Sequence, residues 1–154
     1  MDIIIRPATH SDMEILLQFE QSLIETERGF DPTIKRNNTN YYDLEQMITS
    51  SDIELVIAQS GEEIVGCGYA RIENAKLFLE YAKYSYLGFM YVKPAYRGKG
   101  VNKKIIEVLK QWSLSKKITE LRLEVYYKNI NAIQAYEKAG FTGLIIEMRM
   151  AIES

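Results

Sequence analysis

The chain is poor in the residues on which disulfide-stapled, metal-binding and triad proteins depend. It contains one cysteine, one histidine and three prolines in 154 residues. One cysteine excludes an internal disulfide and favours a reducing compartment, so we expect a cytoplasmic protein. The lone histidine, His10, stands at the start of a helical pattern. We therefore expect neither a histidine-based catalytic triad nor a metal site.

Long apolar runs and a strong basic excess are missing as well. No apolar stretch reaches membrane-spanning length, and the opening residues 1–7 are too short for a signal peptide, so we expect no membrane partner. Net charge is -2, from 19 bases and 21 acids, which does not favour a nucleic-acid partner. No linker, repeat or low-complexity segment interrupts the chain. Its composition, 47% hydrophobic and 26% charged, predicts one domain over residues 1–154.

Hydrophobic periodicity predicts a single mixed α/β sheet with helices. Helices are expected at about 13–27, 42–49, 99–115 and 131–138, the last one stopping at Gly140. Strands are expected at 3–6, at 53–57 and 64–72 as a hairpin, at 84–92, and at 121–126. Residues 141–152 are expected to add a last strand or pair of strands, which either closes the sheet or meets a second copy in a homodimer.

The stretch from Tyr96 to Asn102, Tyr-Arg-Gly-Lys-Gly-Val-Asn, lies between an expected strand and an expected helix. Two glycines around a lysine let the backbone turn sharply, and the N–H groups of the next helix then face the loop. Such a place favours a phosphate. Five bases lie nearby with no acid among them: Lys93, Arg97, Lys99, Lys103 and Lys104. The alternative is a plain strand-to-helix turn with a basic solvated face.

The Walker form and the dinucleotide fingerprint are both absent from this loop, so another phosphate carrier must fit. Three segments bear on its identity: Ile5-Arg6-Pro7-Ala8, Val92-Lys93-Pro94-Ala95-Tyr96-Arg97-Gly98-Lys99-Gly100, and Asn129-Ile130-Asn131-Ala132-Ile133-Gln134-Ala135-Tyr136-Glu137-Lys138-Ala139-Gly140-Phe141. In order and spacing they resemble the GNAT family of acetyl-CoA-dependent N-acetyltransferases. The resemblance covers essentially the whole chain, and the two later segments together are specific. It implies a GNAT-like domain, a mostly antiparallel mixed sheet with about four helices, and acetyl-CoA as cosubstrate without a metal.

The resemblance also assigns cofactor-binding residues. The family loop has Arg or Gln, two residues, Gly, one residue, then Gly or Ala; Arg97 and Gly100 fill the first two fixed places. Asn102 stands where a small residue is usual, and its side chain either crowds or hydrogen-bonds the pyrophosphate. Pyrophosphate contacts are implied for backbone groups of Gly98, Lys99, Gly100, Val101, Asn102 and Lys103. Pantetheine contacts are implied for Met90, Tyr91 and Val92, and a further cofactor contact for Asn129, which otherwise reads as a helix cap.

Two side chains are implied for the chemistry. Tyr136 matches the family tyrosine that protonates the departing thiolate; its alternative is a half-buried aromatic. Glu124 matches the base of the subset that includes the bacterial ribosomal-protein N-terminal acetyltransferases; its alternative is a strand glutamate paired with Arg122 or Lys128. The central-strand glutamate of many members is replaced here by Tyr86.

Other carboxylates are held in reserve as the base, namely Glu80, Glu20 and Glu27, and a water chain without a dedicated base is also open. Some of the eleven tyrosines are expected to line the acceptor cleft, and Cys67 reads as a small buried hydrophobe. The expected activity is acetyl transfer to a primary amine by direct attack. The acidic first third, with ten acids and four bases in residues 1–52, favours a small cationic acceptor. The alternatives are a protein N-terminal acetyltransferase and a non-catalytic CoA-binding sensor.

Overall fold

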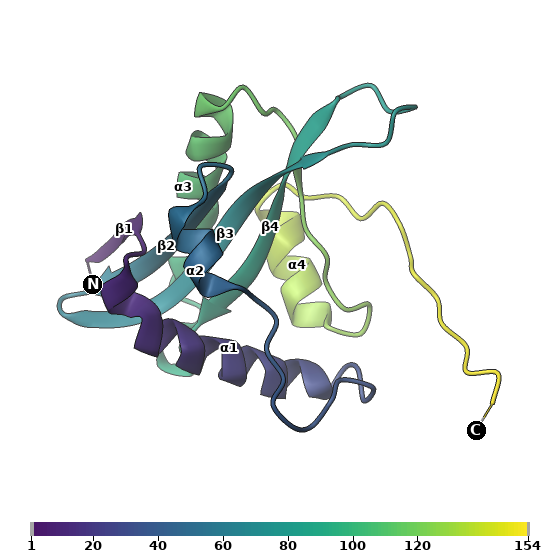
Figure 1. Cartoon of the computed structure of the whole chain (residues 1–154), viewed down its shortest axis with the longest axis horizontal. Coiled ribbons are helices and arrows are strands. Elements are labelled where there is room, and N and C mark those ends of the chain that lie inside the picture. Colours follow the sequence, from purple (N-terminus) through teal and green to yellow (C-terminus); the bar gives the residue numbers. More distant parts are fainter. Residues whose placement is uncertain (1, 154) are drawn as a thin grey trace. The chain divides into compact units, whose positions relative to one another are not determined.

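The computed structural model describes residues 2–153. The chain forms two compact units, one up to Glu124 and one from Val125 onward. The first unit holds a five-stranded sheet in the order β1-β2-β3-β4-β5. Figure 1 labels β1, β2, β3 and β4. Neighbouring strands are antiparallel except for β4 and β5, which are parallel. The strands are β1 Ile3–Pro7, β2 Ile53–Ser60, β3 Glu63–Asn74, β4 Lys83–Val92 and β5 Leu121–Arg122.

Helices cover both faces of this sheet. On one face, α1 (Met13–Arg28) and α2 (Leu44–Thr49) bury Leu16, Phe19, Leu44 and Met47 in the core that they share with β2, β3 and β4. On the other face lies α3 (Val101–Ser115), since Gly68 of β3 points away from that core, against Ile105 of α3. Two short 3-10 helices, His10–Asp12 and Pro94–Tyr96, precede α1 and α3 respectively.

The start of α1 is tied to the first strand. Asp12 accepts a hydrogen bond from the Thr9 N–H at 2.8 Å. Both of its oxygens also accept from the Arg6 guanidinium of β1, each at 2.9 Å. These contacts, with the Arg6 hydrogen bond foremost, lower the pKa of the buried Asp12 carboxyl. The expected start of the first helix is thus fixed by an ion pair that the sequence did not reveal.

The second unit is built on α4 (Ile130–Lys138). Asn129 caps it, because its side-chain oxygen accepts from the Ala132 N–H at 3.3 Å. Gly140 follows the helix with φ at 109°, a left-handed conformation that glycine adopts readily. The predicted end of this helix is therefore confirmed.

The predicted order of helices and strands is confirmed up to β5. The expected length of β5 and the strand expected after α4 need correction. The strand expected at 121–126 is only two residues long, since β4 pairs with β5 only at Ser85↔Leu121 and Tyr86↔Arg122. The strand expected at 141–152 was wrong, because the structure assigns no strand to residues 141–153. Apolar side chains there, such as Leu144, Met148 and Met150, are exposed. Alternation supplies the propensity for a strand, but the strand itself requires a backbone partner.

Candidate active site

The expected phosphate loop lies between β4 and α3 and has open space beside its two glycines. Its two glycines are left-handed, with φ at 75° in Gly98 and 82° in Gly100. A Cβ atom added to either glycine would meet nothing within 4 Å, so the space beside the loop is free. Helix α3 begins at Val101, and its first N–H groups have no partner within the helix. The residues present therefore fit an anionic group such as a pyrophosphate.

A carboxylate that the sequence analysis missed braces this loop. Glu63, at the start of β3, accepts from the Lys93 ammonium at 3.0 Å and from the Tyr96 hydroxyl at 2.9 Å. These hydrogen bonds, that of Lys93 first, lower the pKa of Glu63. Arg97 Nε donates to the Val92 carbonyl at 2.8 Å. The basic cluster is thus partly committed to holding the loop in shape, and no short-range sequence signal points to Glu63.

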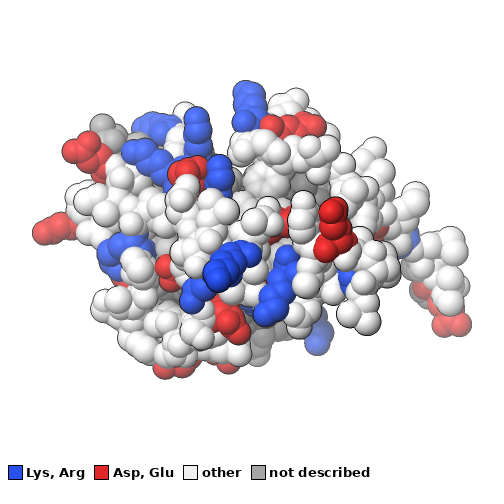
Figure 2. Space-filling view, turned by 90° about the horizontal axis from the view of Figure 1, so that it is seen from above, with Lys and Arg blue, Asp and Glu red and all other residues white. Residues whose placement is uncertain are grey.

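Asn102 and the surface charges give less support to a phosphate site than the two glycines do. Asn102 Oδ1 is buried and accepts no hydrogen bond from the described residues, so this atom does not anchor the loop. On the face drawn in Figure 2, basic side chains are interspersed with acidic ones and form no continuous band.

Strand β4 carries a bulge just before the loop. Cys67 of β3 faces Tyr91, but Tyr69, two residues further along β3, faces Gly88, three residues back along β4. The extra residue in β4 takes a left-handed conformation at Phe89, with φ at 52°. A bulge of this kind disrupts the ladder locally and redirects the strand.

The bulge lies beyond the end of the β4–β5 ladder. After Tyr86, β4 has no further paired residue in β5, so residues 87–92 have a backbone edge not used by that strand. Such an edge can lend its N–H and C=O groups to an extended ligand. It includes Met90, Tyr91 and Val92, the residues expected to meet pantetheine. The Val92 carbonyl is already used by Arg97, which the sequence did not suggest.

The candidate base Glu124 lies beside Tyr86. The Tyr86 hydroxyl donates to Glu124 Oε1 at 2.9 Å. Burial, and after it the Glu124 charge, raises the pKa of Tyr86. Arg122, one of the two partners expected if Glu124 were only a paired strand residue, pairs with Glu120 at 2.9 Å; the other expected partner was Lys128.

Strand β3 adds a cation to this group. The Arg71 guanidinium lies 5.5 Å from the ring centres of both Tyr69 and Tyr86 and forms an ion pair with Glu73. Tyr69 is buried, and a Cβ atom at Gly88 would come within 2.5 Å of its hydroxyl. The Tyr69 side chain therefore lies directly over the bulged part of β4. Neither Arg71 nor Tyr69 carried a sequence signal, because only the register of β3 and β4 brings them here.

The reserve carboxylates have different positions. Glu20 is fully buried, and its Oε2 accepts from the backbone N–H groups of Tyr41 and Tyr42 at 2.8 and 2.9 Å, which anchors the loop before α2. Burial raises the pKa of Glu27, and a Tyr41 hydrogen bond opposes that effect. Glu80 is exposed in the β3–β4 loop. Glu20 is therefore a structural anchor that solvent does not reach.

Aromatic rings pack together beside the bulge in β4, while their expected place in an acceptor cleft stays a prediction. Tyr42 stacks on Phe89 with ring centres 4.6 Å apart and meets Tyr69 edge-on at 5.8 Å. The aromatic face thus continues from the segment before α2 to the bulge in β4.

Two other chemically notable residues lie outside this arrangement. Cys67 is fully buried, its thiol donates to the Phe89 carbonyl at 3.4 Å, and burial raises its pKa. His10 lies 2.7 Å from a Glu45 oxygen at the surface. Residues 2–153 contain no cluster of three or more potential metal ligands. No described helix is long and apolar enough to cross a membrane.

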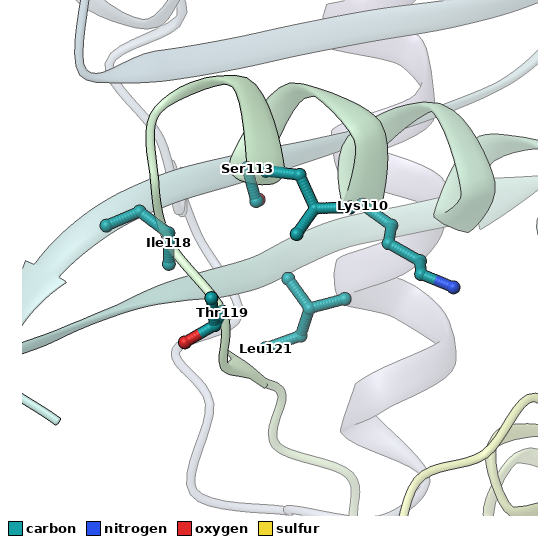
Figure 3. Close-up of a pocket in the computed structure, with 6 residues that line it drawn as sticks. Lys110, Ser113, Ile118, Thr119 and Leu121 are labelled. Atoms are coloured by element: carbon teal, nitrogen blue, oxygen red, sulfur yellow. The ribbon is translucent and has the colours of Figure 1, made fainter. Parts of the chain in front are cut away.

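A shallow pocket of about 190 Å³ occurs elsewhere on the first unit (Figure 3). Its lining comes from the second half of α3 and from the segment that leads to β5, including Lys110, Ser113, Ile118, Thr119 and Leu121. Since Gly100 precedes the opposite end of α3, this pocket is separate from the glycine loop. It holds no carboxylate, and Lys110 is its only ionisable group.

The sequence of the chain matches the family described as the acetyltransferase (GNAT) family over residues 18–141. The chain belongs to the GNAT family. This confirms the family expected from the sequence and its enzyme class, the acetyltransferases. Acetyl-CoA, the expected cosubstrate, fits this family. The match includes the glycine loop, Tyr86, Glu124, Asn129 and Tyr136.

Individual relatives of this GNAT protein match over shorter segments. Streptothricin acetyltransferase of Escherichia coli is 43% identical over 51 residues, which cover 33% of this chain and 29% of that protein. Thialysine N-epsilon-acetyltransferase of Bos taurus is 42% identical over 55 residues, which cover 36% of this chain and 32% of that protein. The chain thus matches only about a third of the length of these relatives.

A solved structure shares the fold. A predicted acetyltransferase from Clostridium acetobutylicum, crystallised with acetyl-CoA, has a TM-score of 0.75 at 16% identity, covering 98% of this chain and 97% of that chain. The expected GNAT fold is confirmed by this likeness.

Two expected site residues of the GNAT protein lie in its second unit. Tyr136 is on α4, with its ring edge-on to Phe141 at 5.9 Å between centres. Asn129 uses its side-chain oxygen to cap α4, which was the alternative expected for it. Its cofactor contact and the acid role of Tyr136 stay predictions.

Proposed function

We propose that this protein is an N-acetyltransferase that moves an acetyl group from acetyl-CoA to the primary amine of a small molecule. One observation carries the proposal: an open left-handed glycine loop precedes α3, and the strand before this loop is bulged and is not paired with β5 over residues 87–92. An extended cosubstrate that carries phosphates could place its phosphates at the loop and its extended arm along the strand. We also propose that residues 1–154 act as one functional domain.

The binding roles follow from the positions of the residues. The backbone N–H groups from Gly98 to Lys103 would hold the pyrophosphate, with Arg97 beside them. The β4 residues Met90, Tyr91 and Val92 would pair with the pantetheine arm through their main chains. Asn129 is assigned a contact with the same cosubstrate.

The chemistry requires few groups. Glu124 would accept the proton that the amine loses as it attacks, and Tyr136 would give a proton to the departing thiolate. The acetyl group passes directly to the amine nitrogen, without a covalent enzyme intermediate. The buried thiol of Cys67 supports this direct route, because burial raises its pKa and disfavours the nucleophilic thiolate.

A small cationic acceptor is favoured by the surroundings of the bulge. Glu124, next to Tyr86, provides a negative charge that attracts an ammonium group, whereas the Arg71 guanidinium already lies over the rings of Tyr69 and Tyr86. Two relatives act on streptothricin and thialysine, according to their names. We propose an acceptor of this kind, in a cytoplasmic setting suited to a chain with one cysteine.

The test is thiol release from acetyl-CoA by the purified protein, with a panel of lysine, thialysine, streptothricin, spermidine and short peptides. Turnover with one small amine, identified by the mass of its acetylated product, is the expected result. Turnover with peptides alone would contradict a small-molecule acceptor and indicate that the protein acetylates protein amino termini. Tight CoA binding without any turnover would favour a sensor and contradict the enzyme.

Tyr136→Phe separates binding from chemistry. We expect kcat to fall by about 10²-fold, as for other lost general acids, while the Kd for CoA is retained. Unchanged kcat would contradict the acid role.

A further inference from the structure

Tyr86 belongs to β4, the strand expected to receive pantetheine, and its hydroxyl donates to the candidate base Glu124 at 2.9 Å. We propose that Tyr86 relays the acceptor amine's proton to Glu124, so that the two residues act together as the base. This inference rests on the proposed function. It assigns a role to the Tyr86 hydroxyl, which the proposed function leaves unused.

The position of the pair follows from strand register. Tyr86↔Arg122 is the last pair of the short β4–β5 ladder, and Glu124 follows two residues after Arg122. The hydrogen bond from Tyr86 to Glu124, at 2.9 Å, therefore forms where the two strands stop pairing. Gly88 and Phe89, which form the bulge, come two and three residues later in β4. The pair thus stands at the beginning of the edge expected to receive pantetheine.

Tyr86 is suited to pass a proton on and unsuited to keep a negative charge. Its hydroxyl already donates to the Glu124 carboxylate, an acceptor-only group when ionised. Burial and the neighbouring carboxylate raise its pKa, so tyrosinate is disfavoured. The other ionisable groups that act on Tyr86 are Tyr69 and Arg71 of β3, and Arg71 is in turn paired with Glu73. Tyr42 faces the same aromatic group from the segment before α2.

Arg71 holds the ring of Tyr86 in place. Its guanidinium lies 5.5 Å from the centres of the Tyr69 and Tyr86 rings, within the range of cation–π attraction. The ion pair with Glu73 fixes the guanidinium itself. Tyr86 is therefore oriented by β3 on one side and by Glu124 on the other, as a relay requires.

The proposed step balances without another reactant. The amine nitrogen forms a bond to the thioester carbonyl carbon while its proton passes to the Tyr86 oxygen. In the same event the hydroxyl proton of Tyr86 passes to Glu124, so Tyr86 ends neutral and Glu124 ends protonated. The C–S bond then breaks, its electron pair leaves with the sulfur, and the acetylated amine is released.

The experiment compares Tyr86→Phe with Tyr84→Phe, using the panel amine that the wild type acetylates best. Tyr84 is a matched control, because it lies two residues earlier in β4 and its ring stacks with Arg122 at 4.0 Å. We expect Tyr86→Phe to lower kcat by about 10²-fold with the KM for acetyl-CoA unchanged, and Tyr84→Phe to leave kcat within about twofold.

Two further readouts separate a relay from mere support of Glu124. In mixtures of H2O and D2O, the wild-type rate should show the curved dependence of two moving protons. The double variant Tyr86→Phe/Glu124→Gln should be no slower than Glu124→Gln alone, because both residues serve one path. A linear dependence in the wild type, or additive losses in the double variant, would overturn the relay.

Failure of this inference is distinct from failure of the proposed function. A wild type that acetylates its amine while Tyr86→Phe keeps full kcat would overturn the relay alone. A wild type that acetylates nothing in the panel would overturn both.

Discussion

Alanine at Gly98 or Gly100 should harm cosubstrate binding far more than folding. Both glycines are left-handed, with φ at 75° and 82°, where a side chain is strained. The strain of a left-handed alanine costs about 1–2 kcal/mol in the free energy of unfolding. No steric term adds to it, because the new Cβ atom would meet nothing within 4 Å. For a chain of this size, each kcal/mol corresponds to a fall in Tm of about 2–4 °C.

Ligand binding should respond differently. If a pyrophosphate lies against this backbone, the added methyl group occupies the space that the ligand needs. We expect the Kd for CoA to rise at least about tenfold, which corresponds to about 1.4 kcal/mol. Isothermal titration with CoA measures this change, and urea unfolding measures the stability of the same samples.

Gly61→Ala is the matched control. Gly61 also has positive φ, 60°, and open space around its Cβ position, but it lies in the β2–β3 turn. It should lose similar stability and keep its affinity for CoA. Wild-type affinity in both loop variants would refute the phosphate assignment. An equal loss of affinity in Gly61→Ala would show that backbone strain, and not contact with the ligand, was responsible.

Two further predictions concern the framework of the site. Asp12→Asn should lower the free energy of unfolding at neutral pH by about 2 kcal/mol, because Arg6 loses its charged partner. The folded-state pKa of Asp12 is lowered, so the loss of stability in the variant should be complete above the unfolded-state pKa of about 4. This loss should disappear as the pH falls through the lower folded-state pKa. Urea unfolding at several pH values measures it, and a loss of stability that does not change with pH would contradict the prediction. Gly88→Ala should cost about 1–3 kcal/mol and slow turnover, because its Cβ atom would displace the Tyr69 hydroxyl. Gly143→Ala, with nothing within 4 Å, is its control, and equal Tm values for the two variants would count against the packing described.

Local signals in the sequence predicted much of the framework. The glycine pair before α3, the capping Asn129 and the terminal Gly140 act within a few residues, so their effects were readable without a structure. Expectations that depended on a backbone partner far away in the sequence were less accurate. The strand expected at 141–152 is absent from the described residues, because apolar alternation cannot by itself supply hydrogen bonds.

The site was predictable in its types of residue and only partly in its geometry. Glu124 was identified by resemblance, but its contact with Tyr86 depends on the register of a two-residue parallel ladder. The left-handed bulge residue is Phe89, and no glycine marks its place in the sequence. Glu63 lies thirty residues before its partner Lys93. Such contacts are set by strand pairing across the sheet.

The sequence by itself determined the family, the order of the helices and strands up to β5, and the glycine loop before α3, because each rests on local backbone preferences and short motifs. Tertiary structure decided which side chains meet: Glu63 with Lys93, Arg71 with Tyr86, and Tyr86 with Glu124. The physical reason is that a shift of one residue in strand register turns every side chain to the opposite face, and long-range packing alone selects the register.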